Sequence, residues 1–203
     1  MNPTKLVQDL IQNSLSSEVL KDYKFSLVSY NRKDPSKGLS PVHYEVNERV
    51  IMDLDADSKD WDSWVEIHRI LSNKNEAGYI NVIRFENMQN HMKNFYIPII
   101  DFAPIVDIEQ CDFSVLKQFG NNKLHIFNSG NSYHGVLNKL MSPFEYIKWV
   151  SVLAELPFVD QKWIAYSANN RYKDHSQVLR TTNSLSLGGI RRPEPTYLKD
   201  IDL

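Results

Sequence analysis

The chain has 203 residues, of which 42% are hydrophobic and 24% charged, and its formal net charge is −2. This length allows one domain with its own core, and the composition excludes a low-complexity chain. A single cysteine excludes an internal disulfide and a multi-cysteine metal site. The near-neutral charge excludes a protein that is basic over its whole surface. Because no apolar run approaches the roughly 20 residues of a membrane span, and the charged start is unlike a signal peptide, we expect a cytoplasmic protein with no membrane partner.

The first 75 residues combine helical and strand patterns. Apolar residues recur at helical spacing in 4–21, which predicts one or two amphipathic helices. Residues 50–52 predict a short strand, and Ser58 is a suitable N-cap for a helix with Trp61 on its apolar face. We expect residues 1–75 to form a helical or α+β segment that packs on a core made by residues 79–203.

Two apolar runs, at residues 79–85 and 95–100, are rich in β-branched and aromatic side chains. Both runs predict strands, and the polar loop between them predicts that they pair with each other. Pro98 has no N–H to donate, so it places the second strand at a sheet edge or a bulge.

The next segment predicts a short helix and then two strands. The helix would carry Val115, Leu116 and Phe119 on one side and end at Gly120. Strands are predicted at 124–127 and, after a tight turn, at 133–137.

Ser142, Pro143 and Glu145 form the clearest helix start in the sequence. An N-cap serine, a proline at the first position and a glutamate at the third predict a capping box and a helix to about Leu156. Further along the chain, strands are predicted at 158–160, 162–166 and 178–182, and the last ten residues are predicted to be extended or loosely held. These elements together predict an α+β fold, with a mixed or antiparallel sheet and flanking helices.

Polar groups follow three of the predicted strands: Asp101, the segment 128–134 and Asp160. Gly130 permits a sharp turn, whose N–H groups and serine hydroxyls would form an anion-binding nest. His134 would donate to a phosphate, and the two aspartates would supply hard oxygen ligands for a divalent metal. This is the outline of a site for a nucleoside triphosphate.

The order of a strand Asp, a Ser-x-His segment and an apolar-Asp segment resembles motifs I, II and III of the archaeo-eukaryotic primases. Residues 129–134 are similar to the Ser-Gly-containing segment of the polymerase domains of bacterial end-joining ligases and of small bacterial primase-like proteins. Residues 160–163 (Asp-Gln-Lys-Trp) and 179–180 (Leu-Arg) fit the latter pattern. The resemblance covers about residues 79–197 and implies a primase-polymerase-like catalytic core with an RRM-like sheet.

For the metal, the resemblance implies that Asp101 and Asp160 are catalytic residues and ligands of Mg²⁺ or Mn²⁺. The family has a second motif I carboxylate two residues after the first, and this chain has Ala103 there. The substitution predicts a weak metal site and puts catalysis in doubt. Asp53 and Asp55 keep the intact Asp-x-Asp form, but Asp53 stands 81 residues before His134, whereas Asp101 stands 33 residues before it.

For the substrate, the resemblance implies that Ser129, Ser132 and His134 contact the phosphates of an incoming nucleotide, with His134 also catalytic. Arg180 resembles a basic position that faces the nucleotide or the template. The implied function is binding of nucleoside triphosphate and nucleic acid, DNA or RNA, with metal-dependent nucleotidyl transfer if the domain is active.

Two alternatives remain open. A catalytically degenerate primase fold would bind nucleic acid or a partner protein without polymerising. A serine hydrolase would use Ser132, Asp160 and His175, which stand in the chain order of the α/β-hydrolase triad. The second glycine of the hydrolase elbow, however, falls one place late, at Gly135.

Overall fold

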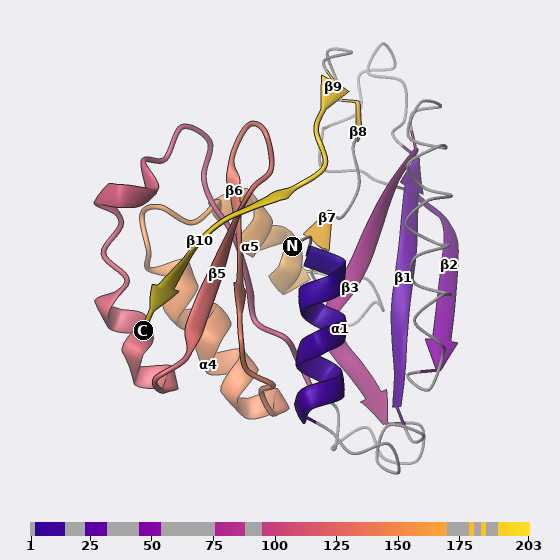
Figure 1. The fold of residues 1–203 in the computed structure, drawn as a ribbon, viewed down its shortest axis with the longest axis horizontal. Helices are drawn as coiled ribbons and strands as arrows, with labels where there is room; N and C mark the ends of the chain where they lie inside the picture. The colour runs from indigo at the N-terminus through magenta and orange to yellow at the C-terminus, as the bar shows by residue number, and fades with distance from the viewer. Residues whose placement is uncertain are drawn as a thin grey trace.

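Two four-stranded antiparallel sheets organise the described part of the chain (Figure 1). The structure is a computed structural model, and it describes residues 3–14, 23–31, 45–53, 76–87, 95–169, 179–180, 184–185 and 191–203. In this described part no helix is long and apolar enough to cross a membrane.

The first sheet has the strand order β2-β1-β3-β7. Its strands are β1 (Tyr23–Asn31), β2 (Glu45–Asp53), β3 (Glu76–Asn87) and β7 (Leu179–Arg180). The strands predicted at 50–52 and 79–85 are confirmed, and the strand predicted at 178–182 is confirmed at Leu179–Arg180. Residues 178, 181 and 182 lie outside the described residues. β1 was not among the predicted strands, although the apolar residues Tyr23, Phe25 and Leu27 alternate along its first half.

The second sheet has the order β10-β5-β6-β4. Its strands are β4 (Ile99–Asp101), β5 (Lys123–Asn128), β6 (Tyr133–Leu137) and β10 (Thr196–Asp202). β4 is an edge strand, as Pro98 predicted. The predicted pairing of 79–85 with 95–100 is wrong, because β3 pairs with β1 and β7 while β4 pairs with β6.

The C-terminal segment is extended but not loosely held. β10 pairs with β5 along most of its length, and Leu203 is 7% exposed. The N–H of Leu203 donates to the carbonyl of Asn122 at 3.0 Å. Before this strand, β8 (Ser184–Leu185) and β9 (Arg191–Arg192) form a two-stranded hairpin.

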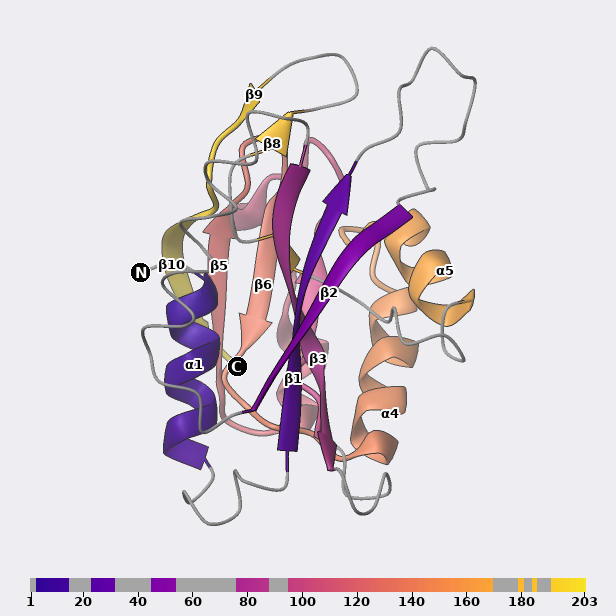
Figure 2. The same cartoon turned by 90° about the vertical axis from the view of Figure 1, so that its right-hand side faces the viewer.

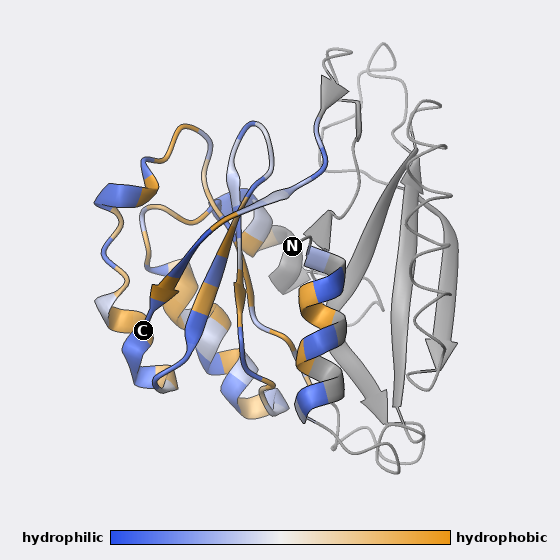
Figure 3. Cartoon of the chain, viewed as in Figure 1, coloured by the Kyte–Doolittle hydropathy of each residue, from blue (hydrophilic) through white to orange (hydrophobic). Residues whose placement is uncertain are grey.

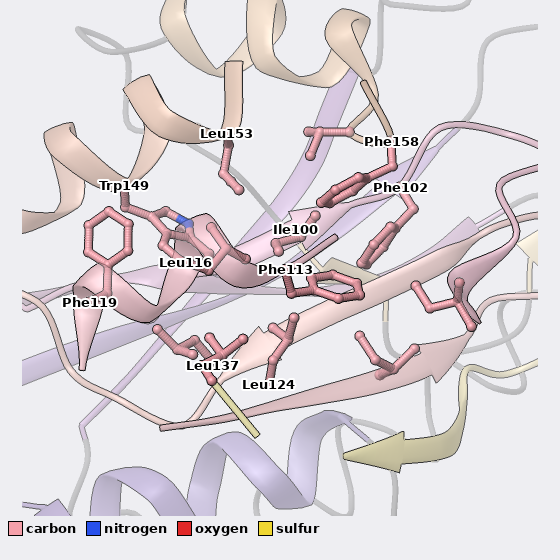
Figure 4. Close-up of a cluster of buried hydrophobic side chains, with 14 of the residues drawn as sticks. Ile100, Phe102, Phe113, Leu116, Phe119, Leu124, Leu137, Trp149, Leu153 and Phe158 are labelled. Carbon is pink, nitrogen blue, oxygen red and sulfur yellow. The ribbon is translucent and has the colours of Figure 1, made fainter. Parts of the chain in front are cut away.

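Helices cover one side of the second sheet and enclose its apolar core (Figure 4). They are α4 (Pro143–Ala154), α5 (Gln161–Asn169) and the 3₁₀ helices η4 (Ile108–Gln110) and η5 (Ser114–Phe119). Trp149 is fully buried in this core, and its indole N–H donates to the carbonyl of Ile99 at 3.3 Å. In η5, Leu116 and Phe119 are buried as predicted, but Val115 is 40% exposed.

The start of α4 confirms the capping box. The Ser142 hydroxyl accepts from the Glu145 N–H at 3.3 Å, and the Glu145 carboxylate accepts from the Ser142 N–H at 3.0 Å. This N–H and the Lys139 ammonium hold the pKa of Glu145 below its ordinary value. The prediction of a strand at 162–166 is wrong, because these residues belong to α5.

Helix α1 (Pro3–Ser14) confirms the first part of the amphipathic prediction. Leu6, Val7 and Leu10 are buried, and hydrophobic and hydrophilic residues alternate around the helix (Figure 3). The helix lies between the two four-stranded sheets in Figure 1, and on the opposite side of the second sheet from α4 in Figure 4. The rest of the 4–21 prediction and the helix predicted after Ser58 lie outside the described residues.

The division into residues 1–75 and 79–203 stays a prediction. Across this boundary, β1 pairs with β3 in the first sheet. Viewed from the right of Figure 1, the strands β1, β2 and β3 lie in front of β5 and β6 (Figure 2).

Candidate functional site

Asp101 and His134 are cross-strand partners. They stand opposite each other in the antiparallel ladder of β4 and β6. The His134 Nε2 lies 3.5 Å from the Asp101 Oδ1, and the two side chains are 12% and 33% exposed. The two atoms form an ion pair when the imidazole is protonated. Strand pairing therefore brings together the candidate residues of motifs I and II, and leaves part of the carboxylate accessible.

Asp160 lies next to Asp101 along the backbone. The Asp160 N–H donates to the Asp101 carbonyl at 2.9 Å, and the Ala103 N–H donates to the Phe158 carbonyl at 2.9 Å. An isolated β-bridge between Phe102 and Val159 lies between these two bonds. The candidate motif III segment thus extends the edge of the second sheet beside β4.

The Asp160 side chain has a structural task at this position. Its Oδ1 accepts from the N–H of Lys162 at 2.8 Å and from that of Trp163 at 3.4 Å. The carboxylate therefore caps the N-terminus of α5, where an anion is also favoured by the helix dipole. Its predicted role as a metal ligand stays a prediction.

The metal donor set in the described part of the chain is small. Among these residues, no three or more His, Cys, Asp or Glu side chains are grouped so that they could hold a metal ion. Asp101 and Asp160 are hard oxygen donors of the kind that Mg²⁺ and Mn²⁺ accept. Their role as joint ligands of Mg²⁺ or Mn²⁺ stays a prediction.

Residues 128–132, which we call the motif II turn, are held by internal hydrogen bonds. The Ser129 N–H and hydroxyl both donate to the Ser132 carbonyl at 2.9 Å. The Gly130 N–H donates to the Asn128 side chain at 2.8 Å, and the Ser132 hydroxyl donates to the Phe102 carbonyl at 2.5 Å. Two N–H groups of the expected anion nest are therefore occupied.

The two serines of the turn shape it and tie it to β4. A hydroxyl has one hydrogen to donate, and those of Ser129 and Ser132 go to main-chain carbonyls. Contact with a phosphate would require each hydroxyl to turn away from its carbonyl. The predicted phosphate contacts of Ser129, Ser132 and His134 stay predictions.

The C-terminal segment packs directly on the motif II turn. Gly130 has a φ of +97°, and a Cβ added there would lie 2.7 Å from the Cδ of Pro193. Thr196 pairs with Asn128 at the start of the turn. Sequence reasoning missed this contact, because no local pattern connects residues that stand 63 positions apart.

A second Asp–His pair lies further along the second sheet. The His125 Nδ1 lies 2.6 Å from the Asp200 Oδ1, linking β5 to β10. Burial opposes ionisation of Asp200, but hydrogen bonds with His125 and Tyr197 and the charge of Lys123 hold its pKa below the ordinary value. The His125 Nε2 is buried and has no hydrogen-bond partner in the described structure.

The remaining predicted residues lie in the first sheet or outside the described residues. Arg180 belongs to β7 and stands opposite Tyr79 of β3. Asp53 is the last residue of β2, an edge strand of the first sheet. Strand pairing thus brings Asp101, not Asp53, to His134, whereas Asp55 and His175 lie outside the described residues.

The domain is α+β, with Asp101 and His134 on neighbouring antiparallel strands and Asp160 beside them. The sequence model of archaeo-eukaryotic primase 1D-like proteins matches residues 61–186, which is more than half of the chain. The chain belongs to this archaeo-eukaryotic primase family, which confirms the resemblance and the predicted fold class. Neither a curated protein nor a solved structure matches the chain.

Proposed function

We propose that this primase-fold domain binds a nucleoside triphosphate, together with a divalent cation, at the Asp101–His134 pair. The observation that carries the proposal is the 3.5 Å approach of the His134 Nε2 to the Asp101 Oδ1 across β4 and β6. An imidazole donates to a phosphate, and a carboxylate holds a cation against the same phosphate. The proposal therefore gives the two side chains complementary roles toward one ligand.

The cation belongs with the nucleotide rather than with the protein alone. Asp101 and Asp160 would hold it, and it would neutralise phosphate charge. Ala103 contributes no oxygen ligand, and one oxygen of Asp160 already accepts hydrogen bonds from α5. Cation binding should consequently be weak until a triphosphate adds its own oxygens.

Metal-dependent nucleotidyl transfer onto a nucleic acid is the second candidate function. The hydrogen bond between the Asp160 N–H and the Asp101 carbonyl favours it, because it places two acidic residues side by side at one sheet edge. Ala103 has no side-chain oxygen, and one oxygen of Asp160 already accepts hydrogen bonds, so few oxygen ligands remain for a cation. This favours nucleotide binding over nucleotidyl transfer. We propose that binding is the main activity and that nucleic acid is the second ligand.

Calorimetric titration of ATP in the presence of Mn²⁺ tests the proposal, with the wild type and Asp101→Asn compared. The wild type should bind ATP only when Mn²⁺ is present, and Asp101→Asn should lose roughly tenfold or more in affinity. ATP binding that survives EDTA, or that Asp101→Asn leaves unchanged, would contradict the proposal. Incorporation of labelled nucleotide on a primed template, measured in parallel, decides whether transfer accompanies binding.

A further inference from the structure

Pro104 and Ile105 form a turn shortly after β4, the strand that carries Asp101. Ile105 is 99% exposed, more than any other large hydrophobic residue in the described part of the chain. Its φ is +68°, and no other non-glycine residue that the structure describes has a positive φ. Side chains branched at Cβ are disfavoured in this backbone region. Isoleucine is therefore poorly suited to the position in two independent ways.

The turn chemistry favours a different residue after Pro104. Where proline is followed by a residue at positive φ, the second place normally belongs to glycine or asparagine, which adopt this conformation with little strain. Asparagine is also polar, as suits an exposed turn. Neither the backbone nor the solvent explains an isoleucine here, so its apolar side chain is better explained by a contact outside the fold.

Buried residues hold the turn from both sides. Before it, Phe102 is fully buried in the core, and its N–H donates to the Tyr133 carbonyl at 3.1 Å (Figure 4). After it, Ile108 is buried, and the Asp107 carboxylate accepts from the Glu109 N–H at 3.0 Å. A strained backbone persists where its surroundings fix it, and such residues cluster at ligand sites.

The turn lies at the sheet edge that carries the candidate site. Asp101 stands four residues before Ile105, and between them the Ala103 N–H donates to the carbonyl of Phe158, two residues before Asp160. A ligand held by the two aspartates would therefore extend beside the turn.

The chemistry of the side chain limits what it can bind. Isoleucine has no charge and no hydrogen-bonding group, so it recognises an apolar surface. The faces of a nucleobase are such a surface, and isoleucine is among the apolar side chains that proteins insert against bases. A stable protein interface buries about 800 Å² on each partner, which a tip of two residues does not provide.

We propose that Ile105 contacts a nucleobase of the ligand that the candidate site binds. The inference rests on the proposed function, since it assigns the base of a ligand whose phosphates lie at Asp101 and His134. The base belongs either to the nucleoside triphosphate or to a nucleic-acid strand, and the test separates these two sources.

The test compares the wild type with Ile105→Asn and Ile105→Leu. Asparagine tolerates a positive φ but is polar, whereas leucine stays apolar. Ile147→Asn is the matched control, because Ile147 is an exposed isoleucine on α4, which follows the end of β6 away from the motif II turn. Ile105→Asn should melt at or above the temperature of the wild type, because it relieves the backbone strain.

Two pairs of probes isolate the base. Calorimetry with Mn²⁺ uses ATP and ribose 5-triphosphate, which has the sugar and the phosphates without the base. Anisotropy uses a short fluorescein-labelled single-stranded DNA and an abasic strand of the same length. Ile105→Asn should lose roughly five- to tenfold in affinity for ATP or for DNA, and Ile105→Leu less. The affinity for the two base-free probes should not change.

The pattern of losses identifies the base. A loss with ATP assigns Ile105 to the base of the nucleotide, and a loss with DNA alone assigns it to the strand. Unchanged binding of ATP and DNA by Ile105→Asn would overturn the inference, as would an equal loss with the base-free probes or in Ile147→Asn. A melting temperature of Ile105→Asn below that of the wild type would also overturn it, because the isoleucine would then serve the fold.

The proposed function can fail separately from this inference. If Asp101→Asn weakens ATP binding while Ile105→Asn changes neither ATP nor DNA binding, the proposed function stands and only the role of Ile105 is refuted. A wild type that binds neither ligand refutes both.

Discussion

Asp101 and His134 stand 33 residues apart in the chain and directly opposite each other in the β4–β6 ladder. Their side chains are only partly buried, with 33% of Asp101 and 12% of His134 exposed. We propose that this pair binds one phosphate–cation ligand.

Two substitutions of Asp160 should distinguish its structural role from its proposed metal-binding role. Asp160→Ala removes the N-cap of α5 and should cost about 1 kcal/mol of folding free energy. Asp160→Asn keeps a capping oxygen and should melt close to the wild type, but it removes the negative charge that a cation requires. Both variants should weaken Mn²⁺-dependent ATP binding. If Asp160→Asn binds ATP and Mn²⁺ like the wild type, Asp160 is only a helix cap.

Ala103→Asp should strengthen metal binding in the absence of nucleotide. Ala103 lies two residues beyond Asp101, and its N–H donates to the carbonyl of Phe158, which stands two residues before Asp160. If Asp101 and Asp160 hold the cation as proposed, a third carboxylate there should lower the Kd for Mn²⁺ by about tenfold, or about 1.4 kcal/mol, measured by calorimetry without ATP. Ala103→Asn is the size-matched neutral control. Equal Mn²⁺ affinity in Ala103→Asp and Ala103→Asn would refute the interpretation of residue 103 as a missing ligand.

Asp200 should stabilise the C-terminal strand in a pH-dependent way. Its pKa is lower in the folded protein than in the unfolded chain, so its ionised form contributes stability above the unfolded value of about 3.9. This contribution is lost as the pH falls through the folded pKa. At neutral pH, Asp200→Asn should lower the free energy of unfolding by about 1–3 kcal/mol, because it weakens the bond to buried His125.

Urea denaturation from neutral to acidic pH measures this effect. The difference in the free energy of unfolding between the wild type and Asp200→Asn should disappear as the pH drops below about 4. Asp202→Asn, an exposed position on the same strand, is the control and should change little. A gap that stays constant with pH would show that the charge of Asp200 does not stabilise β10.

Local signals predicted most elements but not their partners. The capping box at Ser142 and the β-branched content of 79–85 are encoded within a few residues, and the structure confirms both. Strand pairing is set by the whole sheet, so the assumed pairing of 79–85 with 95–100 was wrong. Aromatic and β-branched residues in 162–166 favour a strand, but the Asp160 side chain caps this segment as the start of a helix.

The candidate site was predictable to a similar extent. The motif order identified Asp101 and His134, and strand register brings these two residues together. The contact between Gly130 and Pro193 depends on a chain reversal that no local pattern encodes. The hydroxyls of Ser129 and Ser132 donate to the carbonyls of Ser132 and Phe102. These hydrogen bonds could not be predicted from a local sequence pattern either.

The two histidines of the second sheet offer a matched comparison. The side chains of His125 and His134 are 9% and 12% exposed, and each lies beside an aspartate. Only His134 adjoins the motif II turn. Replacement of either histidine by alanine should therefore destabilise the fold, but only His134→Ala should weaken nucleotide binding.

The most direct test of the central claim is a titration of ATP with Mn²⁺ into the wild type, His134→Ala and His125→Ala, with thermal melts of all three. His134→Ala should lose roughly 10–150-fold in ATP affinity, which corresponds to about 1.5–3 kcal/mol for a hydrogen bond to a charged group. His125→Ala should bind ATP like the wild type at a temperature where it is folded. Equal ATP affinity in His134→Ala and His125→Ala would contradict the account.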